Sequence, residues 1–171
     1  MDNKTELRIK AKSIRKNLDI SAISAKAVTL IKQHRFYINS SNIMIFYPTK
    51  YEINLLTLIT DEKNYYLPKV EGEKLLVCPY NKYCKLEKSS FNIFEPCSNP
   101  VRTDILDLVI VPALMADNFG YRLGYGGGFY DRFLSDCAPK TKTLTVIPKE
   151  LLVNKLPRED FDRKIDEIIV A

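Results

Sequence analysis

Apolar residues recur every three or four positions at the start of the chain. Between Leu7 and Leu18, four apolar residues follow one another at intervals of 4, 3 and 4, which is the spacing of one face of an α-helix. We therefore expect a helix over residues 4–18. At about 100° per residue, Lys4 and Arg8 fall on one face of that helix, beside its apolar stripe.

The next segment has the same periodicity. Asp19 or Ser21 is suited to cap a second helix, because a short polar side chain accepts hydrogen bonds from the first free N–H groups. This helix is expected to end near His34. Its inward face is made of Ile23, Ala27, Leu30 and Ile31.

Short apolar runs that end at proline or polar residues predict strands. Two of them, 42–47 and 107–112, are almost wholly apolar, which is typical of strands buried on both faces in a parallel sheet. Weaker patterns predict further strands at 64–67, 74–80, 142–147 and 165–170, short helices at 53–60 and 129–137, and an irregular segment with room for a hairpin at 81–103.

This alternation of strands and helices predicts the fold class. We expect an α/β protein, a three-layer α/β/α sandwich with a largely parallel central sheet and the N-terminal helices packed on it. A length of 171 residues fits a single domain over 1–171, and we expect a monomer.

Composition and charge narrow the function classes. No apolar run approaches the roughly 20 residues that cross a bilayer, and the polar N-terminus does not have the pattern of a signal peptide. We therefore expect a cytoplasmic protein without a membrane partner. The net charge of +5 comes from dispersed lysines and arginines, which argues against nucleic acid as a partner but would attract polyanionic small molecules.

Histidine and cysteine offer little chemistry. The four cysteines have no metal-ligand spacing and are expected to be reduced thiols. His34 is the only histidine, and its place at a helix end indicates a structural role. A histidine-based triad or metal site is therefore nearly excluded.

The glycines concentrate in one segment. Five of the six fall within nine residues, namely Gly120, Gly124, Gly126, Gly127 and Gly128. Glycine permits positive φ and lets backbone N–H groups approach a ligand closely. Between a buried strand and a helix, such a loop predicts an anion site, most often for phosphate. Arg122 can add a bidentate phosphate donor, and Asp131 a carboxylate suited to Mg²⁺.

The loop matches neither common nucleotide fingerprint. No Gly-Lys-Ser/Thr follows it, and no Gly-x-Gly-x-x-Gly register fits. A turn that merely connects a strand to a helix is the alternative interpretation, but such a turn needs only one or two glycines.

The wider segment closely resembles a family signature. Asp117-x-x-Gly120-x-Arg122-Leu-Gly-Tyr-Gly-Gly-Gly-Phe-Tyr-Asp131-x-x-Leu134 is similar to the signature of 5-formyltetrahydrofolate cyclo-ligases, also called methenyltetrahydrofolate synthetases. Weaker matches follow in the right order over nearly the whole chain, at Lys4-x-x-Leu7-Arg8, Tyr47-Pro48-x-x-x-Glu52-Ile53, Phe91-x-Ile93-x-Glu95-Pro96 and Asp162-x-x-Ile165-Asp166.

The resemblance implies an ATP- and Mg²⁺-dependent cyclisation of 5-formyltetrahydrofolate to 5,10-methenyltetrahydrofolate. It places the small-molecule substrates and the metal on named residues. Arg122 and Tyr130 would be catalytic; ATP would contact Lys4, Arg8, Arg122, Gly124, Tyr125, Gly126, Gly127, Gly128, Phe129 and Tyr130; the folate would contact Tyr47, Glu52, Tyr125 and Phe129; and Asp131 and Asp166 would bind Mg²⁺.

Other interpretations of these residues stay open. Lys4 and Arg8 could form a solvated helix face, Glu52 could cap the next helix, Asp166 could be a strand-end residue and Tyr47 could belong to the core. At the level of function, the alternatives are an inactive relative that binds folate or nucleotide and an ATP-dependent ligase for another one-carbon substrate. Asn92 stands where the family usually has glycine, but this departure removes no predicted phosphate or metal group.

Overall fold

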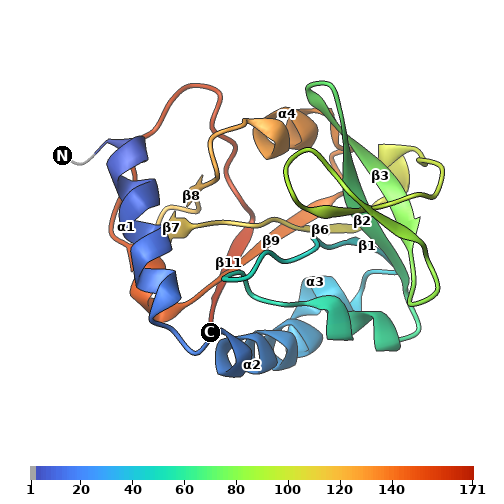
Figure 1. Ribbon diagram of the computed structural model, residues 1–171, viewed down its shortest axis with the longest axis horizontal. Helices are drawn as coiled ribbons and strands as arrows, with labels where there is room; N and C mark the ends of the chain where they lie inside the picture. The colour runs from blue at the N-terminus through green and yellow to red at the C-terminus, as the bar shows by residue number, and fades with distance from the viewer. Residues whose placement is uncertain (1–2) are drawn as a thin grey trace.

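A six-stranded sheet forms the centre of the computed structural model, which describes residues 3–171. Its strand order is β11-β9-β6-β1-β2-β3 (Figure 1). All neighbours are parallel except β2 and β3, which form an antiparallel hairpin. The strands are β1 Asn42–Met44, β2 Asn64–Glu71, β3 Lys74–Tyr80, β6 Leu108–Ile110, β9 Lys142–Ile147 and β11 Glu167–Val170.

Helices cover both faces of this sheet, so the predicted three layers are confirmed. Helices α2 (Ile20–Gln33) and α3 (Arg35–Ile38) lie on one face and α4 (Phe129–Asp136) on the other (Figure 1). Successive strand residues point to opposite faces. Ile43 therefore packs with Ala27 of α2, while its neighbour Met44 packs with Phe133 of α4.

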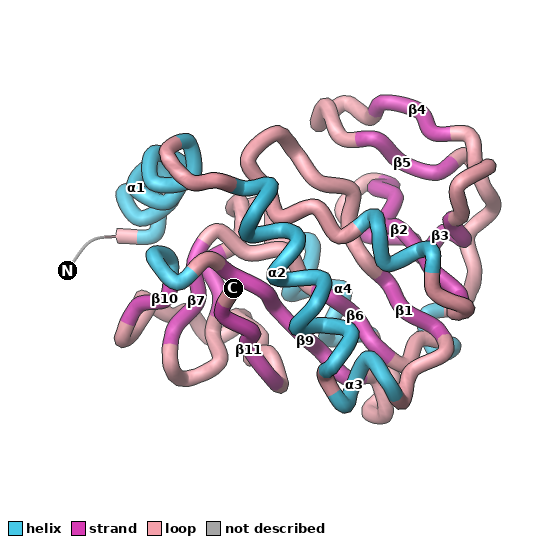
Figure 2. Tube along the Cα trace, turned by 90° about the horizontal axis from the view of Figure 1, so that it is seen from below, coloured by secondary structure: helices cyan, strands magenta, loops and turns pink. Residues whose placement is uncertain are grey.

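The first helix, α1 (Lys4–Lys16), packs elsewhere. Its Leu7 and Ala11 are buried against Met115 and Leu123, which belong to a small three-stranded sheet of β10 (Leu152–Val153), β7 (Met115–Asp117) and β8 (Arg122–Leu123). The expectation of N-terminal helices on the central sheet thus holds for α2 but not for α1. Helix α1 lies far along the long axis from the hairpin of β4 (Leu86–Lys88) and β5 (Phe94–Pro96) (Figure 2).

Several boundaries differ from the predictions. Strand β2 continues through Pro68 to Glu71, because β1 pairs with β2 only as far as Tyr66 and leaves the proline free of that ladder. The segment predicted as a helix at 53–60 is the 3₁₀ helix η1 (Leu56–Thr60), and further 3₁₀ turns are η2 (Thr103–Ile105) and η3 (Lys149–Leu151). Strands β7 and β8 separate the glycine loop from β6, so the loop does not follow that buried strand directly.

Within residues 3–171, no helix has both the length and the apolar character needed to cross a membrane.

Candidate active site

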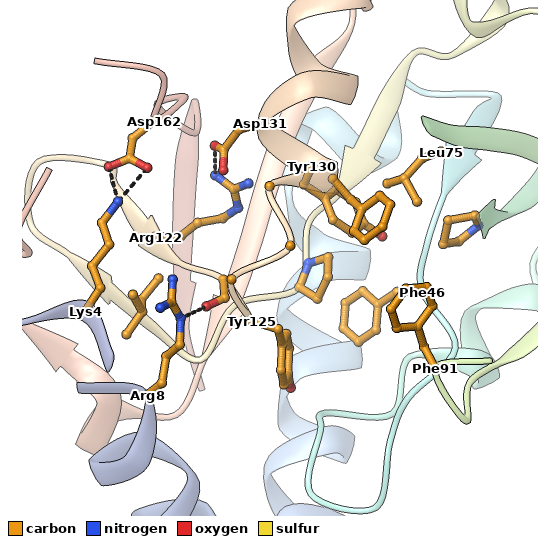
Figure 3. Close-up of a pocket in the computed structure, with 18 of the residues that line it drawn as sticks. Lys4, Arg8, Phe46, Leu75, Phe91, Arg122, Tyr125, Tyr130, Asp131 and Asp162 are labelled. Carbon is orange, nitrogen blue, oxygen red and sulfur yellow. Dashed lines mark hydrogen bonds and ion pairs between the residues drawn. The ribbon is translucent and has the colours of Figure 1, made fainter. Parts of the chain in front are cut away.

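A cavity of about 1000 Å³ lies between α1, the glycine loop, the edge of the central sheet and the β4–β5 hairpin. Its two halves differ in chemistry (Figure 3). Lys4, Arg8, Arg122 and two carboxylates lie on one side of Tyr125, and apolar and aromatic side chains lie on the other. The cavity therefore offers a charged compartment joined to a flat, apolar one.

The glycine loop, residues 124–128, connects β8 to α4. Gly126 and Gly128 have φ angles of 106° and 67°, a region that costs other residues conformational energy. Gly128 is also the N-cap of α4, and no side chain accepts a hydrogen bond there. The first N–H groups of α4 are thus left without a side-chain cap at the positive end of the helix dipole, which suits an anionic ligand.

Arg122 is the most deeply buried cation at the cavity. Its side chain is 3% exposed and Nη1 donates to Oδ1 of Asp131 at 3.1 Å. Nη1 also donates to the main-chain oxygen of Arg163 at 3.2 Å. Its Nε is buried and has no hydrogen-bond partner among residues 3–171. A buried donor without a partner is costly, so this atom is suited to meet a bound anion.

Helix α1 brings two further cations to the loop. A capping box between Asn3 and Glu6 starts the helix at Lys4. One turn later, Nε of Arg8 donates to the carbonyl oxygen of Gly124 at 2.9 Å. This bond fixes the glycine loop against α1 and leaves the remaining guanidinium donors of Arg8 beside the loop.

Lys4 is paired with two carboxylates. Its Nζ lies 2.7 Å from oxygens of both Asp162 and Glu159. Partial burial acts to lower the pKa of Lys4, but the hydrogen bonds and charges of Asp162 and Glu159 outweigh it and the pKa is raised. Lys4 therefore stays charged at neutral pH.

The apolar compartment is lined by aromatic rings. Tyr47 packs on Phe94 with ring centroids 5.2 Å apart, and Phe91 meets the edge of Phe129 at 5.7 Å. One wall of this compartment also contains a buried carboxylate, that of Glu52. Glu52 is 7% exposed, and its Oε2 accepts a hydrogen bond from the main-chain N–H of Thr49 at 2.7 Å. Flat apolar walls with one carboxylate suit a planar heterocycle that carries N–H donors.

Tyr130 lies on the apolar side of Tyr125, near Leu75 (Figure 3). Its hydroxyl is buried and has no hydrogen-bond partner among residues 3–171. Burial, together with the negative charge of Glu52, raises the pKa of this phenol, and Arg122 only partly offsets the effect. Tyr130 is therefore a protonated donor at neutral pH, with no acceptor among residues 3–171.

Comparison with known proteins shows the family of this chain. The model of the "5-formyltetrahydrofolate cyclo-ligase family" matches residues 1–171. The chain belongs to the 5-formyltetrahydrofolate cyclo-ligase family. The mouse 5-formyltetrahydrofolate cyclo-ligase is 28% identical over 95% of this chain and 87% of its own length. The protein of that name from Haemophilus influenzae is 29% identical over 97% and 96%. The solved 5,10-methenyltetrahydrofolate synthetase of Aquifex aeolicus has a TM-score of 0.85 and 31% identity, covering 98% of this chain and 89% of that one.

The fold brings together nearly all the residues that the cyclo-ligase signature implied. Of the fourteen positions named as candidate site residues, thirteen line the cavity. Those that line it are Lys4, Arg8, Tyr47, Glu52, Arg122, Gly124, Tyr125, Gly126, Gly127, Gly128, Phe129, Tyr130 and Asp131.

Asp166 is the exception. It does not line the cavity, and its Oδ2 accepts hydrogen bonds from the main-chain N–H and the hydroxyl of Thr143, at 2.8 and 3.0 Å. Its own N–H donates back to that hydroxyl at 2.8 Å. Asp166 therefore joins the segment before β11 to β9, which agrees with the alternative interpretation of a strand-end residue.

Sequence reasoning did not single out Asp162 or Glu159. Both line the cavity beside Lys4, and the main-chain N–H of Arg163 donates to Asp131 at 3.0 Å, which places this segment next to Asp131. The signal was present, because Asp162 opens the matched stretch Asp162-x-x-Ile165-Asp166. The choice between these two aspartates depends on three-dimensional contacts.

Proposed function

We propose that this protein uses ATP to close the ring of 5-formyltetrahydrofolate, forming 5,10-methenyltetrahydrofolate, ADP and phosphate. The observation that carries the proposal is the buried, unpartnered Nε of Arg122, in a glycine-lined charged compartment that opens directly into an aromatic one. A triphosphate suits the first compartment and a pterin suits the second. The junction between them is where a phosphoryl group would meet a formyl oxygen.

The chemistry balances with these two substrates alone. The formyl oxygen attacks the γ-phosphorus and ADP leaves. The nitrogen at position 10 then attacks the activated formyl carbon, the carbon–oxygen bond breaks, and the phosphate departs with the proton from that nitrogen. Phosphoryl transfer depends on positioning and charge neutralisation more than on a strong base, so a site without histidine is suited to it.

The residues divide this work between them. Arg122, Arg8 and the loop N–H groups would hold the triphosphate, and Lys4 would exchange its carboxylate partners for phosphate oxygens. Tyr130 would donate its hydrogen bond to the oxygen transferred from the formyl group to phosphate. In the other compartment, Glu52 would accept the N–H donors of the pterin between the aromatic rings.

Magnesium fits the charged compartment, and we propose Asp131 and Asp162 as the carboxylates that would hold it. Both line the cavity at the phosphate end. Residues 3–171 contain no group of three or more His, Cys, Asp or Glu side chains that could hold a metal by itself. Two carboxylates plus substrate phosphates is the usual environment of Mg²⁺. When bound, the ion would neutralise charge on the triphosphate. Asp166 is left out because it does not line the cavity. A cytoplasmic location and a monomeric state remain predictions from the sequence.

The test is the near-ultraviolet absorbance of the methenyl product, followed with 5-formyltetrahydrofolate and Mg²⁺ in the presence and absence of ATP. Arg122→Ala should lower kcat/KM about a hundredfold or more, since it removes a pre-organised donor at the developing charge. Arg102→Ala is the matched control, because the Arg102 side chain is exposed and, among residues 3–171, bonds only Asp104. No ATP-dependent product from the wild-type protein, with both ligands bound, would contradict the proposal and indicate an inactive relative or another substrate.

A further inference from the structure

A second, smaller cavity of about 160 Å³ adjoins the main one. Thr49 and Tyr125 line both cavities and form the partition between them. From the other side, the small cavity is lined by three cations of one helix, Lys12, Arg15 and Lys16 of α1. They follow Lys4 and Arg8 along the same helix, so α1 presents basic residues to both cavities.

Arg15 is a buried cation, held in place by hydrogen bonds, that lines this small cavity. Its side chain belongs to a residue that is only 3% exposed, and its Nη groups donate to the main-chain oxygens of Tyr51, Ala113 and Leu114. Its Nε is buried and has no hydrogen-bond partner among residues 3–171. A buried guanidinium that bonds only neutral carbonyls keeps its full charge and one free donor for a ligand.

Within residues 3–171, no carboxylate lines the small cavity beside Arg15. Within residues 3–171, neither Lys12 nor Lys16 takes part in an ion pair, although Nζ of Lys12 lies 5.9 Å from the ring centroid of Tyr125. Glu52, the nearest acidic group by its effect on Arg15, lines the main cavity and is bonded to Thr49. Three cationic residues therefore line a space that, within residues 3–171, no carboxylate lines.

The apolar compartment of the main cavity lacks any such cation. The lysine and arginine residues that line the main cavity are Lys4, Arg8, Arg122 and Arg158. The first three lie on the phosphate side of Tyr125 (Figure 3), and Arg158 is held by Asp117 and stacked on Tyr121. A folate whose pterin occupies the aromatic compartment ends in a glutamate with two carboxylates, and these find no cation inside that compartment.

We propose that the small cavity and the α1 cations Lys12, Arg15 and Lys16 bind the glutamate tail of the folate substrate. The inference rests on the proposed function, since it takes 5-formyltetrahydrofolate as the ligand. The path runs from the aromatic compartment past Thr49 and Tyr125 to α1. Longer tails, with one more carboxylate per added glutamate, would continue along the exposed lysines of the helix.

The test compares substrates that differ only in the tail: the pteroate form without glutamate, the monoglutamate and the triglutamate of 5-formyltetrahydrofolate. The double variant Lys12→Gln/Lys16→Gln should raise KM for the triglutamate about five- to tenfold, as expected for the loss of two partly exposed charge pairs. Its KM for the pteroate form, its KM for ATP and its kcat should not change. Lys88→Gln is the matched control, because Lys88 is an exposed lysine beside Phe94 of the aromatic compartment and does not line the small cavity.

Arg15 is tested separately, since its loss could disturb folding. Arg15→Lys keeps the charge but not the fixed guanidinium, and equilibrium binding of the monoglutamate should weaken severalfold while thermal unfolding shows a folded protein. Equal KM changes for all three substrates, no change in the double variant, or a tail effect in Lys88→Gln would overturn the inference. These outcomes presuppose an active wild-type protein; a wild type that turns over none of the three substrates would instead refute the proposed function, and this inference with it.

Discussion

At the scale of single residues, Tyr130 has an unusual combination of properties. It has a buried hydroxyl without a partner and a raised pKa caused by burial and by Glu52. Such a group is a cost to folding unless a ligand uses it. The Nε of Arg122 is likewise buried and without a hydrogen-bond partner among residues 3–171, so the same reasoning applies to it.

Removing the Tyr130 hydroxyl should therefore separate stability from activity. Tyr130→Phe is expected to raise the free energy of unfolding by about 1 kcal/mol, because it deletes an unsatisfied buried donor. The same change should lower kcat about ten- to a hundredfold, since the transferred oxygen loses its hydrogen bond. Denaturant unfolding and steady-state kinetics measure the two effects. Phe133→Leu, which changes a ring that packs on Tyr130, is the control, and an unchanged kcat in Tyr130→Phe would exclude a role for the hydroxyl.

Two glycines of the loop should respond differently to alanine. A Cβ on Gly124 meets no atom within 4 Å, and Gly124 lines the cavity. Gly124→Ala is therefore expected to fold normally and to raise KM for ATP by crowding the phosphate. A Cβ on Gly126 meets the Arg8 guanidinium at 3.3 Å, at a φ of 106°, so Gly126→Ala should also lose about 1–3 kcal/mol of stability. Equal stability of the two variants would contradict this account of the loop.

At the scale of elements, two aspartates that lie four positions apart in the segment before β11 have different roles. Asp162 faces the cavity and Lys4, while Asp166 is bonded to Thr143 of β9. Asp162→Asn should raise the Mg²⁺ concentration needed for half-maximal activity and lower the free energy of unfolding by less than about 1 kcal/mol, because Lys4 keeps Glu159 as a partner. Asp166→Asn should lower the free energy of unfolding by about 1–3 kcal/mol and leave the Mg²⁺ requirement unchanged. The reverse pattern would favour Asp166 as the metal ligand, as the family resemblance implied.

The turn between β7 and β8 depends on the buried carboxylate of Asp117. Its oxygens accept hydrogen bonds from the main-chain N–H groups of Phe119, Tyr121 and Leu156, and from Arg158. Burial acts to raise the pKa of Asp117, but these bonds outweigh it and the pKa is lowered. The turn precedes Arg122, so the carboxylate also positions the phosphate site.

The lowered pKa of Asp117 gives a pH dependence with a definite sign. Its stabilisation is fully present above the unfolded pKa of about 3.9 and is lost as the pH falls through the lower folded value. Asp117→Asn should lose about 2–4 kcal/mol of stability at neutral pH, because an amide N–H₂ would face backbone donors. The difference from wild type should shrink below pH 4 in denaturant titrations. Asp160→Asn, at an exposed position, is the control, and a pH-independent difference would contradict the assignment.

Elements with a long period or an unbroken apolar run were predictable from the sequence. The stripe from Leu7 predicted α1 because its period repeats over several turns, and the apolar run at 107–112 predicted β6, although that strand itself has three residues. Strands β7 and β8 have three and two residues, too few for a period to be visible. The glycine loop and Arg122 could be found from composition and spacing. Asp162 could not be separated from Asp166, because the hydroxyl of Thr143 that engages Asp166 is distant in sequence.

At the scale of the whole molecule, the cavity is assembled from segments that the fold keeps apart elsewhere. Helix α1 packs on the small sheet, while the aromatic compartment belongs to the edge of the central sheet and the β4–β5 hairpin. The hairpin reverses at Asn92, which has a positive φ of 60°, where asparagine is among the few residues that can replace glycine. The glycine loop and Tyr125 lie between the two parts (Figure 3). The arrangement holds two different substrates end to end, with the reacting atoms at the partition.

The transfer of oxygen between the two substrates tests this arrangement most directly. 5-Formyltetrahydrofolate labelled with ¹⁸O in the formyl group would be converted with ATP and Mg²⁺, and the inorganic phosphate would be analysed by mass spectrometry. The account predicts one labelled oxygen in the phosphate for each methenyl product formed. Unlabelled phosphate beside labelled water would contradict it, because ATP would then be hydrolysed without activation of the formyl oxygen.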